Sequence, residues 1–122
     1  MVGVDLFAGA GGLSLGARLA GVEVKLAIES DIFAAETYSY NHPSTRVLVK
    51  DVRSIHPLDS VSTRKDMILF GGPPCQGFST SNQKTRNLEN PNNWLFREFL
   101  RVASLIKPAW IVFENVTGIL ET

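Results

Sequence analysis

The stretch VGVDLFAGAGGLSLGARLA, which spans residues 2–20, holds the clearest change from strand to helix in the chain. Its first six residues, 2–7, are almost all apolar and predict a buried strand. The Gly-rich residues 9–12 predict a turn, and residues 13–20 predict a helix that stops at Gly21. A buried strand that passes through a tight turn into a helix is typical of a parallel sheet covered by helices.

The same alternation continues along the rest of the chain. The further predicted strands are 22–28, 46–49, 66–70 and 110–113, and the further predicted helices are 31–40 and 93–107. Residues 53–65 are polar and carry little helical signal. Residues 71–92 are rich in Gly, Pro, Ser and Asn and predict a long loop, of a kind that is usually functional or disordered. The pattern predicts an α/β fold with a parallel sheet of about five strands and helices on both faces.

Length and composition narrow the class of protein. A chain of 122 residues is enough for one domain, and 12 Lys and Arg against 12 Asp and Glu give no net charge. This balance excludes a strongly basic nucleic-acid-binding module, although not a local basic surface. A single cysteine, Cys75, excludes a disulfide framework and a cysteine-rich zinc site. There is no apolar run of membrane-spanning length and no signal-peptide pattern, so we expect a soluble cytoplasmic protein with no membrane partner.

Acidic residues follow successive predicted strands, where ligands bind in open α/β sheets. Glu29 lies twenty residues after Gly9 and could accept both hydroxyl groups of a ribose, and Asp51 could accept from an adenine amino group. Ser14 stands where a dinucleotide fingerprint needs Gly, which disfavours a nicotinamide cofactor. A glycine turn alone is more often a plain structural turn. Together the glycine turn, Glu29 and Asp51, which follow three successive strands, predict a site for an adenosine-type cofactor.

Two further motifs carry reactive side chains. Cys75 lies between Pro-Pro and Gln-Gly at the start of the long loop, which suits an exposed nucleophile better than a packing residue. Glu114 follows the last strand, where alone it would be read as a solvated residue. If the first, fourth and fifth strands are neighbours, Cys75 and Glu114 project over the same sheet edge. That arrangement predicts covalent catalysis with proton assistance.

Three of these motifs resemble, in order, those of the cytosine-5 DNA methyltransferase family. They are Asp5–Gly12, Pro73–Ser79 and Glu114–Val116, and the resemblance covers essentially the whole chain. Glu29, Asp51 and Asn93–Phe96 are similar to lesser blocks of the family at matching spacing. The resemblance implies a Rossmann-like, S-adenosyl-L-methionine-dependent methyltransferase fold. It also implies methyl transfer to carbon 5 of a cytosine flipped out of double-stranded DNA, with S-adenosyl-L-homocysteine as the product.

The resemblance also implies a role for individual residues. Those expected to bind the cofactor are Phe7, Gly9, Gly11, Glu29, Asp51, Val52 and Leu95. The Cys75 thiolate would attack ring carbon 6, and Glu114 would hydrogen-bond ring nitrogen 3 and the exocyclic amine. Pro74 and Asn115 would hold these two side chains in place. The loop would close over the base, and its candidates for phosphate contacts are Ser79, Ser81, Lys84 and Arg86.

The family pattern extends beyond what these residues contain. Its later Arg-bearing block, its target recognition region and its late cofactor-completing segment have no counterpart in 1–122, and Trp94 stands where a smaller residue is frequent. We therefore expect residues 1–122 to be the N-terminal part of the catalytic domain, weak or inactive alone. A second chain or a C-terminal half would complete the enzyme. The alternatives are methylation of cytosine in RNA and a non-catalytic module that binds the cofactor or a partner through an open sheet edge.

Overall fold

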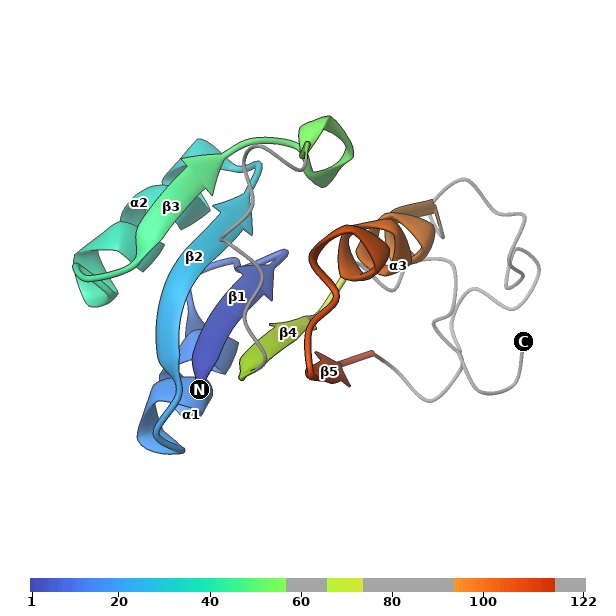
Figure 1. The fold of residues 1–122 in the computed structure, drawn as a ribbon. Coiled ribbons are helices and arrows are strands. Elements are labelled where there is room, and N and C mark those ends of the chain that lie inside the picture. Colours follow the sequence, from blue (N-terminus) through green and yellow to red (C-terminus); the bar gives the residue numbers. More distant parts are fainter. Residues whose placement is uncertain (57–65, 74–93, 116–122) are drawn as a thin grey trace.

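The predicted alternation of strands and helices is present in a computed structural model that describes residues 1–56, 66–73 and 94–115 (Figure 1). The elements, in chain order, are β1 (Val2–Leu6), α1 (Gly12–Leu19), β2 (Glu23–Glu29), α2 (Ile32–Asn41), β3 (Arg46–Val49), the short 3-10 turn η1 (Val52–Ser54), β4 (Met67–Gly71), α3 (Trp94–Ile106) and β5 (Trp110–Phe113).

The five strands form one parallel sheet in the order β3-β2-β1-β4-β5. The chain moves outward from β1 to β3 and then returns to the other side of β1 to place β4 and β5. The direction of winding therefore changes between β1 and β4, and such a switch point is where open α/β sheets bind ligands, at the carboxyl ends of their strands. The predicted fold class is confirmed. The first, fourth and fifth strands are neighbours, which meets the condition on which the pairing of Cys75 with Glu114 depends.

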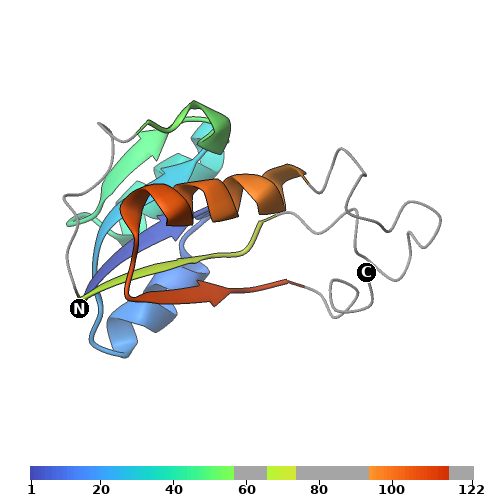
Figure 2. The ribbon, with the colours of Figure 1, turned by 45° about the vertical axis from the view of Figure 1, so that its right-hand side comes forward.

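Helices cover both faces of the sheet. In Figure 1 and Figure 2, α3 lies on one face, and α1 and α2 lie on the other. The larger core lies under α3, where Val4, Leu6 and Leu69 of the sheet pack with Phe99 and Val102 of the helix. The face of α3 that meets the sheet is apolar, and its Phe99, Val102 and Ile106 are all buried. A smaller cluster on the opposite face includes Ala27 and Tyr38.

The predicted bounds differ from the observed ones by at most one residue at the strand and helix ends. The turn η1 is a genuine difference, because the sequence predicts no element there. It forms because the Asp51 side chain accepts from Arg53 N, which gives a polar segment a local cap. Residues 57–65, most of the long predicted loop and residue 93 lie outside the described ranges. Within those ranges, every helix is too short or too polar to cross a membrane.

The edge strand β5 is apolar and open to solvent. Trp110, Ile111 and Val112 are 63%, 49% and 45% exposed. On the α1 side of the sheet, an apolar hollow of about 210 Å³ lies between that helix and strands β4 and β5, with Ile68, Phe70 and Val112 in its lining. Exposed apolar edge strands are rare in native proteins, because their unpaired backbone groups can pair with a strand of another chain.

Candidate active site at the carboxyl edge of the sheet

The turn between β1 and α1 holds the backbone in an unusual conformation. Phe7, Gly9 and Gly11 have positive φ angles of 57°, 56° and 98°. Glycine adopts such angles readily, but for phenylalanine they cost about 1–3 kcal/mol, and residues of this kind cluster at ligand sites. Ala8 N donates to the Ile28 oxygen, and Gly11 N donates to the Ala8 oxygen, both at 3.0 Å. The turn therefore presents a fixed and strained backbone at the end of β1.

Glu29 ends β2 with its carboxylate held against this turn. Its Oε1 accepts from Gly9 N at 2.8 Å, and its Oε2 accepts from Asp31 N at 2.8 Å. Glu29 is only half-buried, and each carboxylate oxygen has the capacity to accept from a further donor. A carboxylate oriented in this way suits the paired hydroxyl groups of a ribose.

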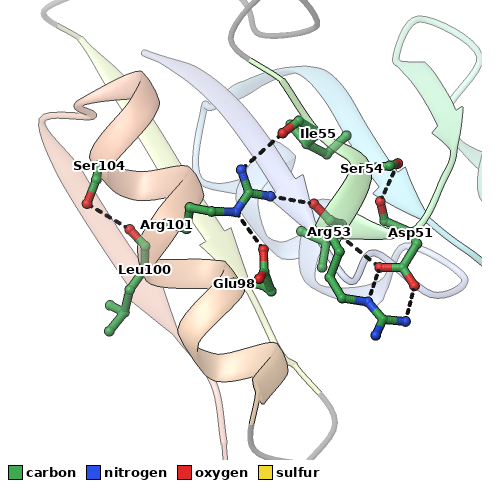
Figure 3. Close-up of polar contacts among 9 residues, drawn as sticks. Asp51, Arg53, Ser54, Ile55, Glu98, Leu100, Arg101 and Ser104 are labelled. Atoms are coloured by element: carbon green, nitrogen blue, oxygen red, sulfur yellow. Dashed lines mark hydrogen bonds and ion pairs between the residues drawn. The ribbon is translucent and has the colours of Figure 1, made fainter.

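Asp51 follows β3 and begins η1. Arg53 N donates to its Oδ1 at 2.9 Å, and Arg53 Nε and Nη2 donate to Oδ1 and Oδ2 at 3.0 and 2.7 Å (Figure 3). The hydrogen bonds from Arg53 hold the pKa of Asp51 below its usual value. The carboxylate is therefore ionised at neutral pH and acts only as an acceptor. Val52, the next residue, is buried under α3.

One pocket of about 280 Å³ joins these groups. Its lining includes every predicted cofactor residue except Gly9 and Gly11, namely Phe7, Glu29, Asp51, Val52 and Leu95. The two glycines lie in the adjoining turn. The remaining lining residues are Ile28, Ser30, Lys50, Arg53 and Gly72. The two carboxylates can accept hydrogen bonds, and apolar side chains lie beside them. This combination fits an adenosine, whose ribose hydroxyl groups and adenine amino group are donors.

The carboxyl ends of β4 and β5 form the second part of the site. Glu114 N donates to the Gly71 oxygen at 3.0 Å. The Glu114 side chain is exposed, and its Oε2 would lie 2.6 Å from a Cβ atom placed on Gly72. A side chain at Gly72 would thus displace the carboxylate from the end of β4. Asn115 Nδ2 donates to the Pro73 oxygen at 3.4 Å.

The predicted nucleophile itself lies outside the described residues. This holds for Cys75 and Pro74 and for the predicted phosphate contacts Ser79, Ser81, Lys84 and Arg86. Their roles, and the catalytic roles of Glu114 and Asn115, stay predictions. The described part brings Glu114 and Asn115 against residues 71–73, the segment that leads directly into Pro74 and Cys75. Gly72 also lines the cofactor pocket, so it connects the two parts of the site.

Three buried polar residues behind the glycine turn are not predicted from the sequence. Asp5, Ser14 and Tyr38 are at most 1% exposed. Ser14 Oγ donates to Asp5 Oδ2 at 2.6 Å and forms a second hydrogen bond of 2.6 Å with Tyr38 Oη. Burial raises the pKa of Asp5 to about 7. A carboxylate in the middle of a buried apolar strand is the signal that could have identified this group.

His42 supports the same turn from the end of α2. Its Nε2 lies 3.0 Å from the Gly11 oxygen, and its Nδ1 lies 2.9 Å from Arg18 Nη1. Because an arginine can only donate, Nδ1 must accept, so the ring proton resides on Nε2 and is donated to Gly11. The sequence indicates His42 only as part of a helix end. Its hydrogen bond spans thirty-one residues along the chain.

The chain resembles several known proteins along nearly its whole length. It matches the C-5 cytosine-specific DNA methylase family over residues 1–122. It is 44% identical over 118 residues to the type II methyltransferase M.DdeI of Desulfomicrobium norvegicum, a match that covers 96% of this chain and 28% of that protein. It is 41% identical over 117 residues to the type II methyltransferase M1.HphI of Haemophilus parahaemolyticus, covering 93% of this chain and 32% of that protein.

A solved structure shares the fold. The crystal structure of a prophage-encoded E. coli protein, described as a DNA modification methyltransferase, superposes with a TM-score of 0.76 at 35% identity. The superposition covers 98% of this chain and 33% of the other. The chain thus spans about a third or less of the length of these relatives. The match through all 122 residues, on a Rossmann-like sheet with its pocket at the switch point, shows that the chain belongs to the C-5 cytosine-specific DNA methylase family.

Proposed function

We propose that this chain carries the cofactor-binding and nucleophilic part of an enzyme that methylates carbon 5 of cytosine in double-stranded DNA. The observation that carries the proposal is the pocket in which Phe7, Glu29, Asp51, Val52 and Leu95 meet. Gly72 is also part of its lining, and the Glu114 side chain lies beside Gly72. The family match is to DNA methylases, so the alternative of RNA methylation is not favoured.

Members of the family use S-adenosyl-L-methionine, which supplies the methyl group. The described residues fit its adenosine part. Glu29, fixed by two backbone donors, would accept from the ribose hydroxyl groups. Asp51, kept ionised by Arg53, would accept from the adenine amino group. Leu95 and Phe7 would cover the apolar faces of the ring.

Cys75 and Glu114 would have different roles in the covalent step. The Cys75 thiolate would add to carbon 6 of a flipped cytosine, which places negative charge on the ring. Glu114 would hydrogen-bond ring nitrogen 3 and the exocyclic amine and stabilise that charge. Carbon 5 would then accept the methyl group. Loss of the proton on carbon 5 and departure of the thiolate from carbon 6 would restore the aromatic ring and the free enzyme.

We further propose that residues 1–122 form the N-terminal part of the catalytic domain, with the target recognition region and the cofactor-completing segment lying elsewhere, on a second chain or a C-terminal half. The length of the relatives supports this division, and so do the exposed apolar residues of β5. Residues 1–122 alone should show weak methyl transfer or none. Robust turnover by this chain alone, measured with a radiolabelled methyl group on duplex DNA, would contradict the division.

Two measurements test the function. Calorimetric titration with S-adenosyl-L-homocysteine should show binding, and Glu29→Gln should weaken it about tenfold, or about 1.4 kcal/mol, because the amide supplies one acceptor oxygen where the carboxylate supplies two. Ser104→Ala is the matched control, since Ser104 Oγ donates to the Leu100 oxygen within α3 and Ser104 does not line the pocket. Equal binding by Glu29→Gln and the unchanged chain would refute the cofactor assignment.

The second measurement is covalent capture of a duplex that carries 5-fluorocytosine, in the presence of S-adenosyl-L-methionine. The fluorine atom cannot leave as the proton does, so the adduct on Cys75 should persist and appear as a shifted band. Cys75→Ser should abolish it. Capture that survives this replacement would show that another residue is the nucleophile.

A further inference from the structure

Arg101 connects two walls of the cofactor pocket and has no role in the proposed chemistry. It lies in the middle of α3, and its guanidinium reaches across to the η1 turn (Figure 3). Nη2 donates to the Val52 oxygen at 2.9 Å, and Nη1 donates to the Ile55 oxygen at 3.0 Å. Nε donates to Glu98 Oε2 at 2.6 Å. A single side chain thus binds both ends of the turn and is itself oriented from its own helix.

The two elements that Arg101 connects each contribute residues to the lining of the pocket. The turn carries Asp51 and Val52, and α3 carries Leu95. Beneath the guanidinium, Val52 and Ile55 are buried in the same core cluster as Phe99 and Val102 of the helix. Apolar packing brings the turn to the helix but has little directional preference. The two carbonyl contacts fix its orientation, because hydrogen bonds to the fork of an arginine are geometrically restrictive.

We propose that Arg101 is a positioning residue that holds the η1 turn against α3 and thereby sets the adenine-facing wall of the cofactor pocket before the ligand arrives. This inference rests on the proposed function, which assigns Asp51 and Val52 to the adenine. Preorganisation of this kind raises affinity because the turn does not have to be ordered when the ligand binds. Arg101 itself does not line the pocket.

The test compares Arg101→Met, Arg101→Lys and Ser104→Ala in the full chain. Methionine keeps an apolar stem of similar length and removes all donors. Lysine keeps the charge but not the fork, so it can serve one carbonyl but not hold both in a fixed geometry. Ser104 lies on the same helix one turn further along, and its hydroxyl bonds only to the Leu100 oxygen in Figure 3. Ser104→Ala therefore controls for a generally weakened helix.

The first readout needs no ligand. Three amides report on the turn: Arg53 N donates to Asp51 Oδ1, Ser54 N to the Asp51 oxygen and Ile55 N to the Val52 oxygen. In Arg101→Met these amides should exchange with solvent about tenfold faster or more, while those of β2 stay protected. The exchange rates in Arg101→Lys should lie between those of Arg101→Met and those of the unchanged chain. The rates in Ser104→Ala should equal those of the unchanged chain.

The second readout is calorimetric affinity for S-adenosyl-L-homocysteine at a temperature where every variant is folded. Arg101→Met should weaken binding about tenfold, with Arg101→Lys intermediate. The effect should shrink in an Asp51→Asn background, because both changes act on the same wall and coupled residues are not additive. A merely structural arginine would lower the melting temperature and leave affinity unchanged in the folded protein.

The outcomes separate the inference from the function on which it rests. Faster exchange at residues 53–55 with weaker binding supports the inference. Unchanged exchange there, or unchanged affinity in folded Arg101→Met, overturns it. If the unchanged chain binds no S-adenosyl-L-homocysteine at all, the cofactor assignment fails. The exchange data then still decide whether Arg101 holds the turn.

Discussion

The cofactor pocket and the β4–β5 edge both lie at the carboxyl ends of parallel strands, yet they are held in different ways. At the pocket, the Glu29 carboxylate accepts two backbone hydrogen bonds of 2.8 Å, and the strained glycine turn is buttressed by buried polar groups. At the edge, Glu114 is exposed and Asn115 contacts Pro73 at 3.4 Å. The described residues therefore build a rigid end, where we propose that the cofactor binds, and a loosely held edge, where we propose that catalysis occurs.

This difference indicates which function each part can perform by itself. Preorganised acceptors bind a ligand without further ordering, so we expect the pocket to bind a nucleoside even when the rest of the catalytic site is not in place. The catalytic edge borders an apolar strand that is still open on one side. We expect substitutions behind the pocket to change the stability of the fold. Substitutions at the edge should change the chemistry and leave the fold almost unchanged.

The largest expected effect is the pH dependence of stability that Asp5, a buried residue of the rigid end, causes. Its pKa is raised from 3.8 to about 7 by burial, so the folded protein keeps this proton where the unfolded chain has lost it. The folded state then binds more protons than the unfolded state between about pH 4 and pH 7, and its stability falls as pH rises through that window. A pKa difference of about three units corresponds to a loss on the order of 4 kcal/mol in the free energy of unfolding.

Asp5→Asn removes this titration and keeps an oxygen that accepts from Ser14 Oγ. Urea unfolding of both proteins from pH 4 to pH 8 isolates the effect as a difference, because the other carboxyl groups, Asp51 included, contribute to both curves. The unchanged chain should lose stability relative to Asp5→Asn as pH rises to about 7, and the difference should then level off. A constant difference across the range would show that Asp5 ionises normally in the folded protein.

The second prediction concerns two adjacent glycines with opposite surroundings. A Cβ atom on Gly11 would lie 2.5 Å from His42 Nε2 and 2.9 Å from the Tyr38 ring, and its φ of 98° is strained for alanine. A Cβ atom on Gly12 would meet no atom within 4 Å. Gly11→Ala should therefore lower the free energy of unfolding by about 2–4 kcal/mol. Gly12→Ala, at the start of α1, should be neutral or slightly stabilising.

Urea denaturation of the two variants checks this contrast. Both add one methyl group to the same turn, so a difference between them reports on His42, Tyr38 and the backbone angle rather than on size. If both variants unfold at the same urea concentration, the turn is less constrained than its contacts indicate, and the contrast between the two ends of the site would weaken.

These two predictions involve groups that the sequence could not place. Apolar periodicity locates strands and helices because it is a local property, and it predicted the parallel sheet and its helices. The adjacency of the first, fourth and fifth strands, on which the Cys75–Glu114 hypothesis depends, was only a condition of that hypothesis, and the strand order supplies it. Hydrogen bonds between distant residues have no local signature. Arg101 meets Val52 across forty-nine positions, and Ser14 meets Tyr38 across twenty-four. The residues that hold the pocket in place could therefore be identified only from the three-dimensional structure.

The smallest effect on stability is expected at the catalytic edge. The Asn115 bond to the Pro73 oxygen is long, so Asn115→Ala should change the free energy of unfolding by no more than about 0.5 kcal/mol. Pro73 nevertheless leads directly into Pro74 and Cys75, and a small displacement of a nucleophile slows its reaction strongly. Covalent capture of the 5-fluorocytosine duplex should therefore slow about tenfold, with affinity for S-adenosyl-L-homocysteine unchanged. A fall in stability without a fall in capture rate would instead place Asn115 with the structural groups of the rigid end.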